Sequence, residues 1–344
     1  MLSVQVNFRT ILKNVNTIKK QLKTGTRFCA VVKANAYGLG LERISKLLAP
    51  VVDCFAVATL HEGIKLRQIG IEQDILVFGI CEDVALATKN NLIITVENIK
   101  QARKIVEENL HPRIHIAVNT GMNRFGITSV HELRETLQIL SYEHVEGFYT
   151  HLAYESNNLN AVKNAIQHFK KLTHICQQYF PRVIVHAGCS GVIDYPPAHF
   201  DMMRIGKALY GGVHGTETAI TVTSKIVTVK KVKPGSTVGY NGNFKTTQAT
   251  LIGVIYGGYA NGIPTQFSSH VNVLVEKTPC PIIGRICMDY CFVDVSHVSQ
   301  PLGKRVTFLA PIKGQTLMDL SNQANMITCN LLLDICRSKI ETLN

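Results

Sequence analysis

The chain has 344 residues, of which 46% are hydrophobic and 17% are charged. This length suits two domains or one large barrel with an addition, and the apolar content excludes an intrinsically disordered protein. The formal net charge is +12 at pH 7. Lys and Arg are spread along the chain, however, and their densest cluster, residues 230–233, ends a strand-like run. We therefore expect a solvated basic face and no nucleic-acid partner, while a positive field would favour an anionic small ligand.

The ten cysteines lie scattered through apolar stretches, without a Cys-x-x-Cys pair or a zinc-ligand spacing. Buried free thiols are typical of a reducing compartment. No apolar run reaches the roughly 18 residues of a membrane span, and the N-terminus lacks a secretory signal pattern. We therefore expect a cytoplasmic protein that binds neither a membrane nor a metal.

Helix-like and strand-like segments alternate through the first two thirds of the chain. Helical periodicity covers residues 7–22, 41–49, 60–69, 97–108, 129–140 and 160–178. Eight strand-like segments alternate with these helices: Phe28–Lys33, Cys54–Ala58, Ile75–Phe78, Leu92–Thr95, Arg113–Val118, Val145–His151, Val183–His186 and Met202–Ile205. Eight strands over about 200 residues predict an α/β fold, a (β/α)8 TIM-like barrel, for residues 1–215.

The pattern changes after Gly215. Short β-branched runs separated by Gly, Pro and Asn turns follow at Ala219–Val232, Leu251–Ile255, Val271–Val275, Ile282–Ile286, Cys291–Val295 and Val306–Leu309, and Met318–Ile340 is helix-like. We predict a mainly β C-terminal domain with C-terminal helices over residues 216–344. Residues 1–7 are strand-like, and we expect them to pair with this domain.

A lysine ends the first barrel strand, in the octet Val31-Val32-Lys33-Ala34-Asn35-Ala36-Tyr37-Gly38. Barrel active sites lie at the carboxyl ends of the strands, where partial desolvation lowers the pKa of a lysine and makes it a nucleophile for a carbonyl cofactor. A strand-ending lysine more often just solvates the barrel rim. The octet, however, resembles the motif by which alanine racemases hold pyridoxal 5'-phosphate (PLP), and the resemblance extends over the whole chain. It implies that Lys33 binds PLP covalently and that Tyr37 contacts the cofactor near the entryway.

Two further stretches at strand ends resemble the same family. The run Asn119-Thr120-Gly121-Met122-Asn123-Arg124-Phe125-Gly126 resembles D-T-G-M-x-R-x-G, which implies that Arg124 steadies the PLP phenolic oxygen and the substrate carboxylate. The sixth strand ends at His151, and the resemblance implies that this histidine orients Arg204. Taken alone, a surface arginine and a structural histidine would be the preferred interpretations.

The loops after the seventh and eighth strands often form the phosphate site of such barrels. Ser190 follows the seventh strand, and Arg204-Ile205-Gly206 belongs to the eighth. We expect the Ser190 hydroxyl and the backbone N–H groups of Gly206 and Lys207 to hold the PLP phosphate. The resemblance implies that Arg204 faces the pyridine nitrogen, where its permanent charge disfavours protonation of the ring.

Inversion of an α-carbon needs one base on each of its two faces. Val238-Gly239-Tyr240 resembles the stretch that presents the second base of the family. The resemblance implies that Tyr240 serves the L-isomer while Lys33 serves the D-isomer. A free tyrosine titrates near pH 10, so its phenolate needs cationic neighbours, for which His151 and Arg204 are the candidates.

Two more motifs of the β domain complete the resemblance. Gly284-Arg285-Ile286-Cys287-Met288-Asp289 resembles G-R-x-x-M-D, which implies that Met288 binds the substrate carboxylate through its backbone amide. Gly257-Gly258-Tyr259-Ala260-Asn261-Gly262 resembles G-Y-A-D-G, which implies that Tyr259 lies at the entryway. In this family the β domain of one subunit closes the barrel of the other. The implied unit is a homodimer with shared active sites.

Several positions depart from the family pattern. Ala117 stands where many members have a carbamylated lysine that braces the active-site arginine, and Asn119 replaces the aspartate. The N-S-A motif reads Cys189-Ser190-Gly191, and Cys329 aligns with a tyrosine that binds the phosphate. Lys207 adds a positive charge where an apolar residue is common. We therefore expect PLP binding with an altered grip on the phosphate.

The leading hypothesis is PLP-dependent racemisation of alanine, which would supply D-alanine for peptidoglycan. The alternatives are a racemase of another small amino acid, such as serine, and a degenerate PLP-binding protein without turnover. A decarboxylase of the same architecture would have a different lysine motif and a Cys-containing loop that this chain lacks. A PLP carrier would consist of the barrel alone, and no aromatic–basic motif indicates nucleic acid. The sequence does not distinguish a biosynthetic from a catabolic role.

Overall fold

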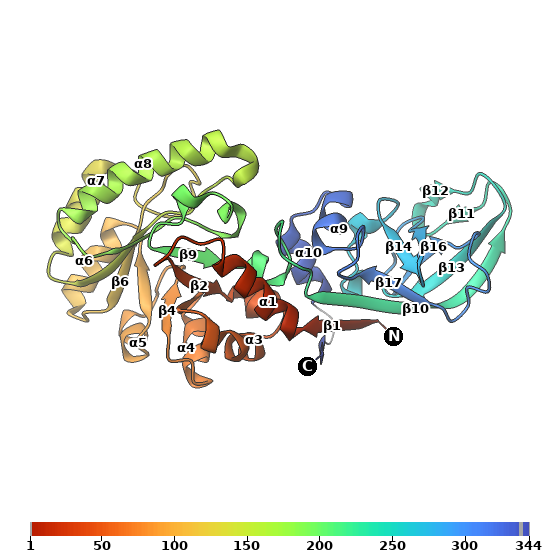
Figure 1. Ribbon diagram of the computed structural model, residues 1–344, viewed down its shortest axis with the longest axis horizontal. Helices are drawn as coiled ribbons and strands as arrows, with labels where there is room; N and C mark the ends of the chain where they lie inside the picture. The colour runs from red at the N-terminus through yellow and green to blue at the C-terminus, as the bar shows by residue number, and fades with distance from the viewer. Residues whose placement is uncertain (1, 337–339, 344) are drawn as a thin grey trace. The chain divides into compact units, whose positions relative to one another are not determined.

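The computed structural model describes residues 2–336 and 340–343, which form two compact units (Figure 1). The barrel unit comprises Val15–Ala36 and Gly40–Gly206, and the C-terminal unit comprises Met1–Asn14, Tyr37–Leu39 and Lys207–Asn344. These units divide the chain after residue 206, whereas the boundary predicted from the sequence lies after residue 215. The domain boundary therefore stays a prediction.

The barrel unit contains one sheet of eight parallel strands surrounded by helices (Figure 1). Its strands are β2 (Arg27–Val31), β3 (Cys54–Val57), β4 (Asp74–Val77), β5 (Ile93–Val96), β6 (Arg113–Ala117), β7 (His144–Tyr149), β8 (Ile184–His186) and β9 (Met202–Ile205). They run in the order β8-β7-β6-β5-β4-β3-β2-β9, and a parallel bridge between Cys189 and Arg204 joins the β8 end to β9. The (β/α)8 prediction is confirmed, and each strand falls on a predicted segment.

Most helices of the barrel unit begin directly after a polar capping residue. The helices are α1 (Phe8–Lys19), which spans the division between the units, α3 (Leu41–Leu48), α4 (Leu60–Gln68), α5 (Val84–Lys89), α6 (Ile99–Glu108), α7 (Val130–Ile139) and α8 (Leu159–Gln177). Side-chain oxygens of Thr59, Asp83, Asn98, Ser129 and Asn158 accept bonds from N–H groups in the first turns of α4 to α8. Each such cap satisfies a backbone donor that the helix leaves unpaired and stabilises the helix by about 1 kcal/mol.

Charged side chains meet at the amino ends of the barrel strands. Asp74 at the start of β4 accepts bonds from Arg27 at 3.0 Å and from Arg113 at 2.8 Å, and Arg113 also pairs with Glu146. Burial alone would raise the pKa of Asp74, but the bonds from Arg113 and Arg27 outweigh it and lower the pKa. In such barrels the amino ends of the strands contribute to stability, and the active site lies at their carboxyl ends.

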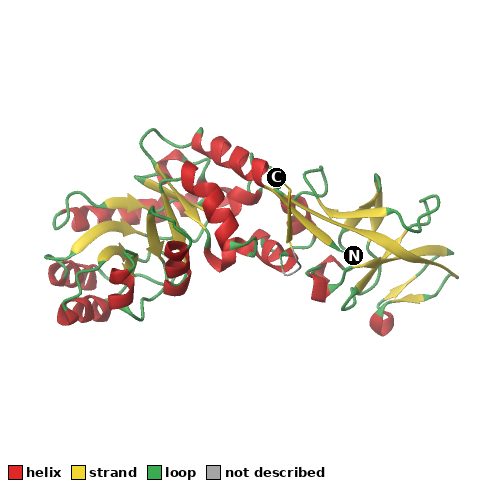
Figure 2. Cartoon of the chain, turned by 90° about the horizontal axis from the view of Figure 1, so that it is seen from below, coloured by secondary structure: helices red, strands yellow, loops and turns green. Residues whose placement is uncertain are grey.

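The C-terminal unit is built mainly from antiparallel strands, drawn in yellow in Figure 2. One sheet has the order β15-β14-β17-β10-β1-β18, and β13 pairs with β10 and β16. The strands are β1 (Ser3–Asn7), β10 (Ile220–Val232), β11 (Thr237–Val238), β12 (Phe244–Lys245), β13 (Thr250–Tyr256), β14 (Asn272–Val275), β15 (Thr278–Pro281), β16 (Tyr290–Asp294), β17 (Arg305–Leu309) and β18 (Ile340–Leu343). The first strand of the chain, β1, runs antiparallel to β10.

Two predicted segments of this unit are wrong in detail. Residues 282–286 form no strand, because Gly284 has a left-handed φ of 67° and ends the extended run, and β15 pairs with β14 instead. The predicted helix Met318–Ile340 is two helices, α9 (Leu317–Gln323) and α10 (Thr328–Ile335), and its last residue begins β18. Residues 337–339 lie outside the described part. The short helix α5 and the β11–β12 hairpin were not predicted.

Candidate functional site

Lys33 stands two residues beyond β2, at the carboxyl end of the barrel. It is half-buried and opens a single turn, α2 (Lys33–Tyr37). Residues 34–37 all have positive φ, between 54° and 57°, although the left-handed conformation costs about 1–2 kcal/mol for each L-residue. Asn35 holds the turn in place: its side-chain oxygen accepts the N–H of Leu41 at 2.8 Å, and its carbonyl accepts the N–H of Gly40 at 2.9 Å. Strain of this kind is typical of functional sites.

Arg124 lies on the loop that follows β6. The side chain of Asn119 shapes this loop by accepting the N–H groups of Gly121 and Asn123, both at 3.0 Å. The loop closes where the N–H of Asn119 donates to the carbonyl of Ile127 and the N–H of Ile127 donates to the carbonyl of Ala117, both at 3.0 Å. Arg124 is exposed, and its guanidinium carbon lies 5.7 Å from the centroid of the neighbouring Phe125 ring.

Arg204 on β9 is buried, with 3% of its surface exposed. One terminal nitrogen lies 2.6 Å from Nδ1 of His186, and the other donates to the carbonyls of Thr150 and Ala187 at 2.8 and 3.0 Å. His151, expected to orient this arginine, lies 3.5 Å from it, so His186 makes the shorter contact. His186 was not among the predicted site residues, although its position at the end of β8, beside β9, was a usable signal.

The histidines around Arg204 are uncharged at neutral pH. Burial, reinforced by the charge of Arg204, lowers the pKa of His186 well below its ordinary value. Burial and then the charges of Arg204, Arg124 and Lys33 lower the pKa of His151 to about 3. A neutral imidazole can accept a hydrogen bond from a guanidinium, so the histidines serve Arg204 as acceptors.

Ser190 and Gly206 meet at the carboxyl ends of β8 and β9. The hydroxyl oxygen of Ser190, which begins the turn η3 (Ser190–Val192), accepts the N–H of Gly206 at 2.9 Å, and both residues are buried. Lys207 follows directly and begins the turn η5 (Lys207–Tyr210) of the C-terminal unit. A serine hydroxyl and nearby backbone N–H groups at this end of a barrel commonly bind an anion such as a phosphate.

The remaining predicted site residues lie in the C-terminal unit, where backbone contacts join their motifs. A Cβ added to Gly284 would lie 2.5 Å from the carbonyl oxygen of Val238, and one added to Gly239 would lie 3.0 Å from the amide nitrogen of Arg285. The β11–β12 hairpin, whose turn carries Tyr240, therefore packs directly on the Gly284–Arg285 segment. Such a close approach is open only to glycine.

The third motif of this unit packs on the second. The amides of Tyr259 and Ala260 donate to the carbonyls of Cys287 and Met288 at 3.1 and 3.0 Å, and a Cβ at Gly258 would lie 2.2 Å from the carbonyl oxygen of Cys287. Large side chains of these segments are exposed: Tyr240 by 62%, Met288 by 54% and Tyr259 by 43%. Three motifs that are separated in the sequence thus pack on one another through their backbones, and each carries a large exposed side chain.

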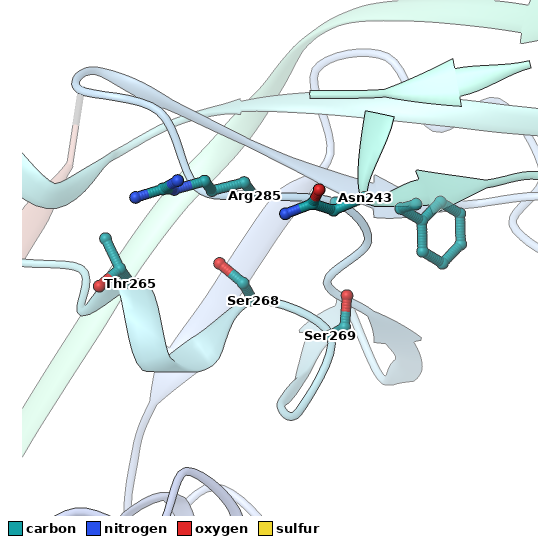
Figure 3. Close-up of a pocket in the computed structure, with 7 residues that line it drawn as sticks. Asn243, Thr265, Ser268, Ser269 and Arg285 are labelled. Atoms are coloured by element: carbon teal, nitrogen blue, oxygen red, sulfur yellow. The ribbon is translucent and has the colours of Figure 1, made fainter. Parts of the chain in front are cut away.

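A small pocket of about 280 Å³ opens on the same unit (Figure 3). Its lining residues are Asn243, Phe244, Thr265, Ser268, Ser269, Gly284 and Arg285. Figure 3 shows the threonine and the two serines on one side, with the asparagine and the arginine opposite. The arginine of the G-R-x-x-M-D-like motif therefore has hydroxyl and amide groups around it.

The structure also places Tyr37 and two residues that depart from the family pattern, Ala117 and Cys329. The Tyr37 ring is buried, 5.5 Å from that of Tyr210. Ala117 is buried at the end of β6, and no acidic side chain of the described residues forms an ion pair with Arg124. Cys329 lies in the first turn of α10, and a Cβ added to Gly212, two residues after the turn η5, would lie 3.1 Å from Cγ2 of the neighbouring Thr328.

The donor groups of the barrel unit fit the cofactor that the resemblance implies. A guanidinium has five N–H groups. His186 and the carbonyls of Thr150 and Ala187 take three of those of Arg204. His151 lies at 3.5 Å from a nitrogen whose two N–H groups these carbonyls already bind, so the remaining N–H groups could serve a ring nitrogen. Lys33 supplies an amine and Ser190 a hydroxyl that suits a phosphate, while the N–H of Gly206 is donated to that hydroxyl oxygen. Within residues 2–336 and 340–343, no group of three His, Cys, Asp or Glu side chains could hold a metal ion, and no helix could span a membrane.

Comparison with known proteins covers almost the whole chain. The model of the alanine racemase N-terminal domain matches residues 6–214, and that of the C-terminal domain matches residues 219–341. An alanine racemase of Streptococcus pyogenes serotype M5 is 31% identical, over 95% of this chain and 94% of the relative. The solved alanine racemase of E. faecalis is 26% identical with a TM-score of 0.87, over 99% and 98% of the two chains. That of Streptomyces coelicolor A3(2), 23% identical over 100% and 98%, has a TM-score of 0.92 and supports the fold alone.

Proposed function

The chain belongs to the alanine racemase family, and from this premise we propose that it interconverts L-alanine and D-alanine with PLP as its cofactor. The observation that carries the proposal is a lysine on a strained turn at the barrel end together with a tyrosine on a hairpin of the C-terminal unit, in a chain that the two family models cover. Racemisation needs such a pair of bases.

The barrel residues would hold the cofactor at three points. Lys33 would bind it covalently, Ser190 with the backbone of Gly206 and Lys207 would bind the phosphate, and Arg204 would donate to the ring nitrogen. The chemistry that the cofactor supplies when bound is withdrawal of electrons from the α-carbon of the amino acid. Because a guanidinium stays charged, Arg204 would keep the ring nitrogen unprotonated and moderate that withdrawal.

Two bases would then move the α-proton. Lys33 would remove or return it on one face and Tyr240 on the other, so that Lys33 serves D-alanine and Tyr240 serves L-alanine. Arg124 and the backbone amide of Met288 would hold the substrate carboxylate, which keeps the α-carbon between the bases. Tyr37 and Tyr259 would line the approach.

We propose a homodimer in which the C-terminal unit of one subunit completes the barrel site of the other. The exposure of Tyr240, Met288 and Tyr259 supports this proposal, because their segments contact one another and large exposed side chains that lie near each other commonly mark an interface. We further propose that the enzyme works in the cytoplasm and supplies D-alanine for peptidoglycan. Serine is the alternative substrate, and a PLP-binding protein without turnover is the alternative function.

The test combines two substitutions with hydrogen exchange. Wild-type protein with added PLP should invert either alanine isomer in deuterated buffer and label its α-carbon. Lys33→Ala should lose covalent retention of the cofactor and all exchange. Tyr240→Phe should keep the cofactor and lower racemisation by about 100-fold or more. It should still label D-alanine without inverting it, because Lys33 can remove and return hydrogen on its own face.

A matched control is Tyr142→Phe, which removes a hydroxyl from a tyrosine that is 96% exposed and should leave the rates unchanged. Full racemisation by Tyr240→Phe would contradict the second-base role. Cofactor retention by Lys33→Ala would contradict the role of the lysine. Exchange of serine but not alanine would favour the alternative substrate, and a bound cofactor without any exchange would favour the inactive alternative.

A further inference from the structure

Two buried histidines meet across a strand that separates them. His115 lies on β6 and His186 on β8, with β7 between these strands in the sheet. Nδ1 of His115 is nevertheless 2.9 Å from Nε2 of His186. Gly147 of β7 is the strand partner of His115, and a Cβ added to it would lie 2.5 Å from three atoms of the His115 ring. The missing side chain at position 147 is what lets this ring cross β7.

The contacts determine the tautomers of both rings. A guanidinium only donates, so His186 accepts the bond from Arg204 on Nδ1 and carries its proton on Nε2. That N–H points at Nδ1 of His115, which must accept it, so the proton of His115 is on Nε2. Burial lowers the pKa of His115 to about 3 and that of His186 well below its ordinary value, so both rings are neutral at pH 7.

The other nitrogen of His115 has no hydrogen-bond partner among the described residues, although only 2% of the residue is exposed. A buried N–H without a partner is destabilising, and an apolar side chain would avoid that cost. Among the described residues, the hydrogen bond of the His115 side chain is therefore the one with His186. This contact supplies a physical reason for a histidine at this position.

We propose that His115 is a positioning residue, which keeps His186 protonated on Nε2 and so preserves Nδ1 as the acceptor for Arg204. In the opposite tautomer, an N–H of His186 would face an N–H of Arg204 at 2.6 Å, and the guanidinium would have to turn away. Gly147 is part of the same arrangement, because a side chain at this position would occupy the space of the His115 ring. The effect on catalysis rests on the proposed function, but the tautomer of His186 does not.

Nitrogen NMR of protein labelled with ¹⁵N-histidine reads the tautomer directly, with and without PLP, and His186→Gln assigns the resonances. Wild-type protein should show one tautomer for His186. His115→Asn places an amide oxygen near the position of Nδ1 and should preserve that tautomer. His115→Leu, similar in volume but without an acceptor, should give a mixture of tautomers. Gly147→Ala, which displaces the ring, should also give a mixture while every histidine is retained.

Kinetics supply the second readout. We expect His115→Leu and Gly147→Ala to lower kcat by about tenfold with little change in KM, and His115→Asn to restore most of the loss, as for other residues that orient an active-site group through a hydrogen bond. An unchanged His186 tautomer in both His115→Leu and Gly147→Ala would overturn the proposal. A wild-type protein that does not racemise alanine would overturn the proposed function instead, while the NMR result would still decide the role of His115.

Discussion

Arg204 carries its positive charge in the barrel interior among neutral partners. His186 and two backbone carbonyls accept its hydrogen bonds, and no acidic side chain of the described residues forms an ion pair with it. Burial lowers the pKa of this arginine because a charge removed from water is destabilising. An acceptor group bound beside Arg204 would recover part of that cost, which couples ligand binding to stability at this residue.

The buried histidines make the stability of the protein depend on pH. The pKa of His115 falls from its ordinary value of 6.5 to about 3, chiefly through burial. Between these values the unfolded chain binds a proton that the folded chain does not, so stability decreases as the pH falls. Each such histidine should lower the free energy of unfolding by about 2 kcal/mol between pH 7 and pH 5. Urea unfolding at the two pH values measures this loss.

His115→Asn removes one titrating ring, so its loss between the two pH values should be smaller by about 2 kcal/mol. Asp74, whose pKa is lowered below 3.8, contributes mainly at lower pH, and the comparison with the variant cancels the groups that the two proteins share. Equal losses in the wild type and the variant would show that folding does not lower the pKa of His115, contrary to the effect of its burial.

Single residues were predictable where a motif met the end of a strand. Lys33 and Arg204 follow or belong to strands whose apolar runs are plain in the sequence, so their position at one end of the barrel could be expected. His115 and Gly147 lie inside such runs, where nothing in the local pattern marks them. Their meeting with His186 depends on the register of three strands, which the sequence does not reveal.

At the scale of elements, the prediction of the barrel succeeded because its strands are short apolar runs separated by amphipathic helices with polar caps. The β module was harder because position-specific backbone geometry decides its strand ends. The apolar run 282–286 has the composition of a strand, but the left-handed φ of Gly284 ends it. The helix α5 has only six residues, too few for periodicity to indicate.

Gly284 offers a test of how the Tyr240 hairpin is supported. Gly284→Ala combines a left-handed alanine with a Cβ only 2.5 Å from the carbonyl oxygen of Val238. Gly303→Ala is the matched control, because Gly303 has a φ of 79° and no atom within 4 Å of an added Cβ. Each should lose about 1 kcal/mol of unfolding free energy to backbone strain, and Gly284→Ala should lose about 1–2 kcal/mol more.

The activities of the two variants distinguish a displaced Tyr240 hairpin from a general loss of protein stability. Gly284→Ala should lower kcat because displaced backbone moves Tyr240, whereas Gly303→Ala should keep its kcat. Urea unfolding and racemisation by each purified variant give the two measurements. Equal stability and equal kcat in both would mean that the contact with Val238 does not hold the hairpin.

For the whole molecule, the predicted site residues divide between the two units, with Lys33, Arg124 and Arg204 in the barrel unit and Tyr240 and Met288 in the C-terminal unit. Sequence motifs could identify both groups because each carries its own short pattern. They could not give the relation between the groups, since that depends on an interface between surfaces and not on local periodicity. The homodimer therefore stays a prediction, and subunit mixing tests it.

Dimers that combine two inactive chains should recover activity if each site is shared. We expect a Lys33→Ala chain and a Tyr240→Phe chain, co-expressed with different tags and purified by both, to give about half the wild-type activity, because one of the two sites then carries neither substitution. The crossed control pairs the wild-type chain with a chain carrying both substitutions. Each shared site would then have one substitution, so this dimer should be nearly inactive. The reverse result, an inactive first dimer and a half-active second, would mean that Lys33 and Tyr240 act within one subunit.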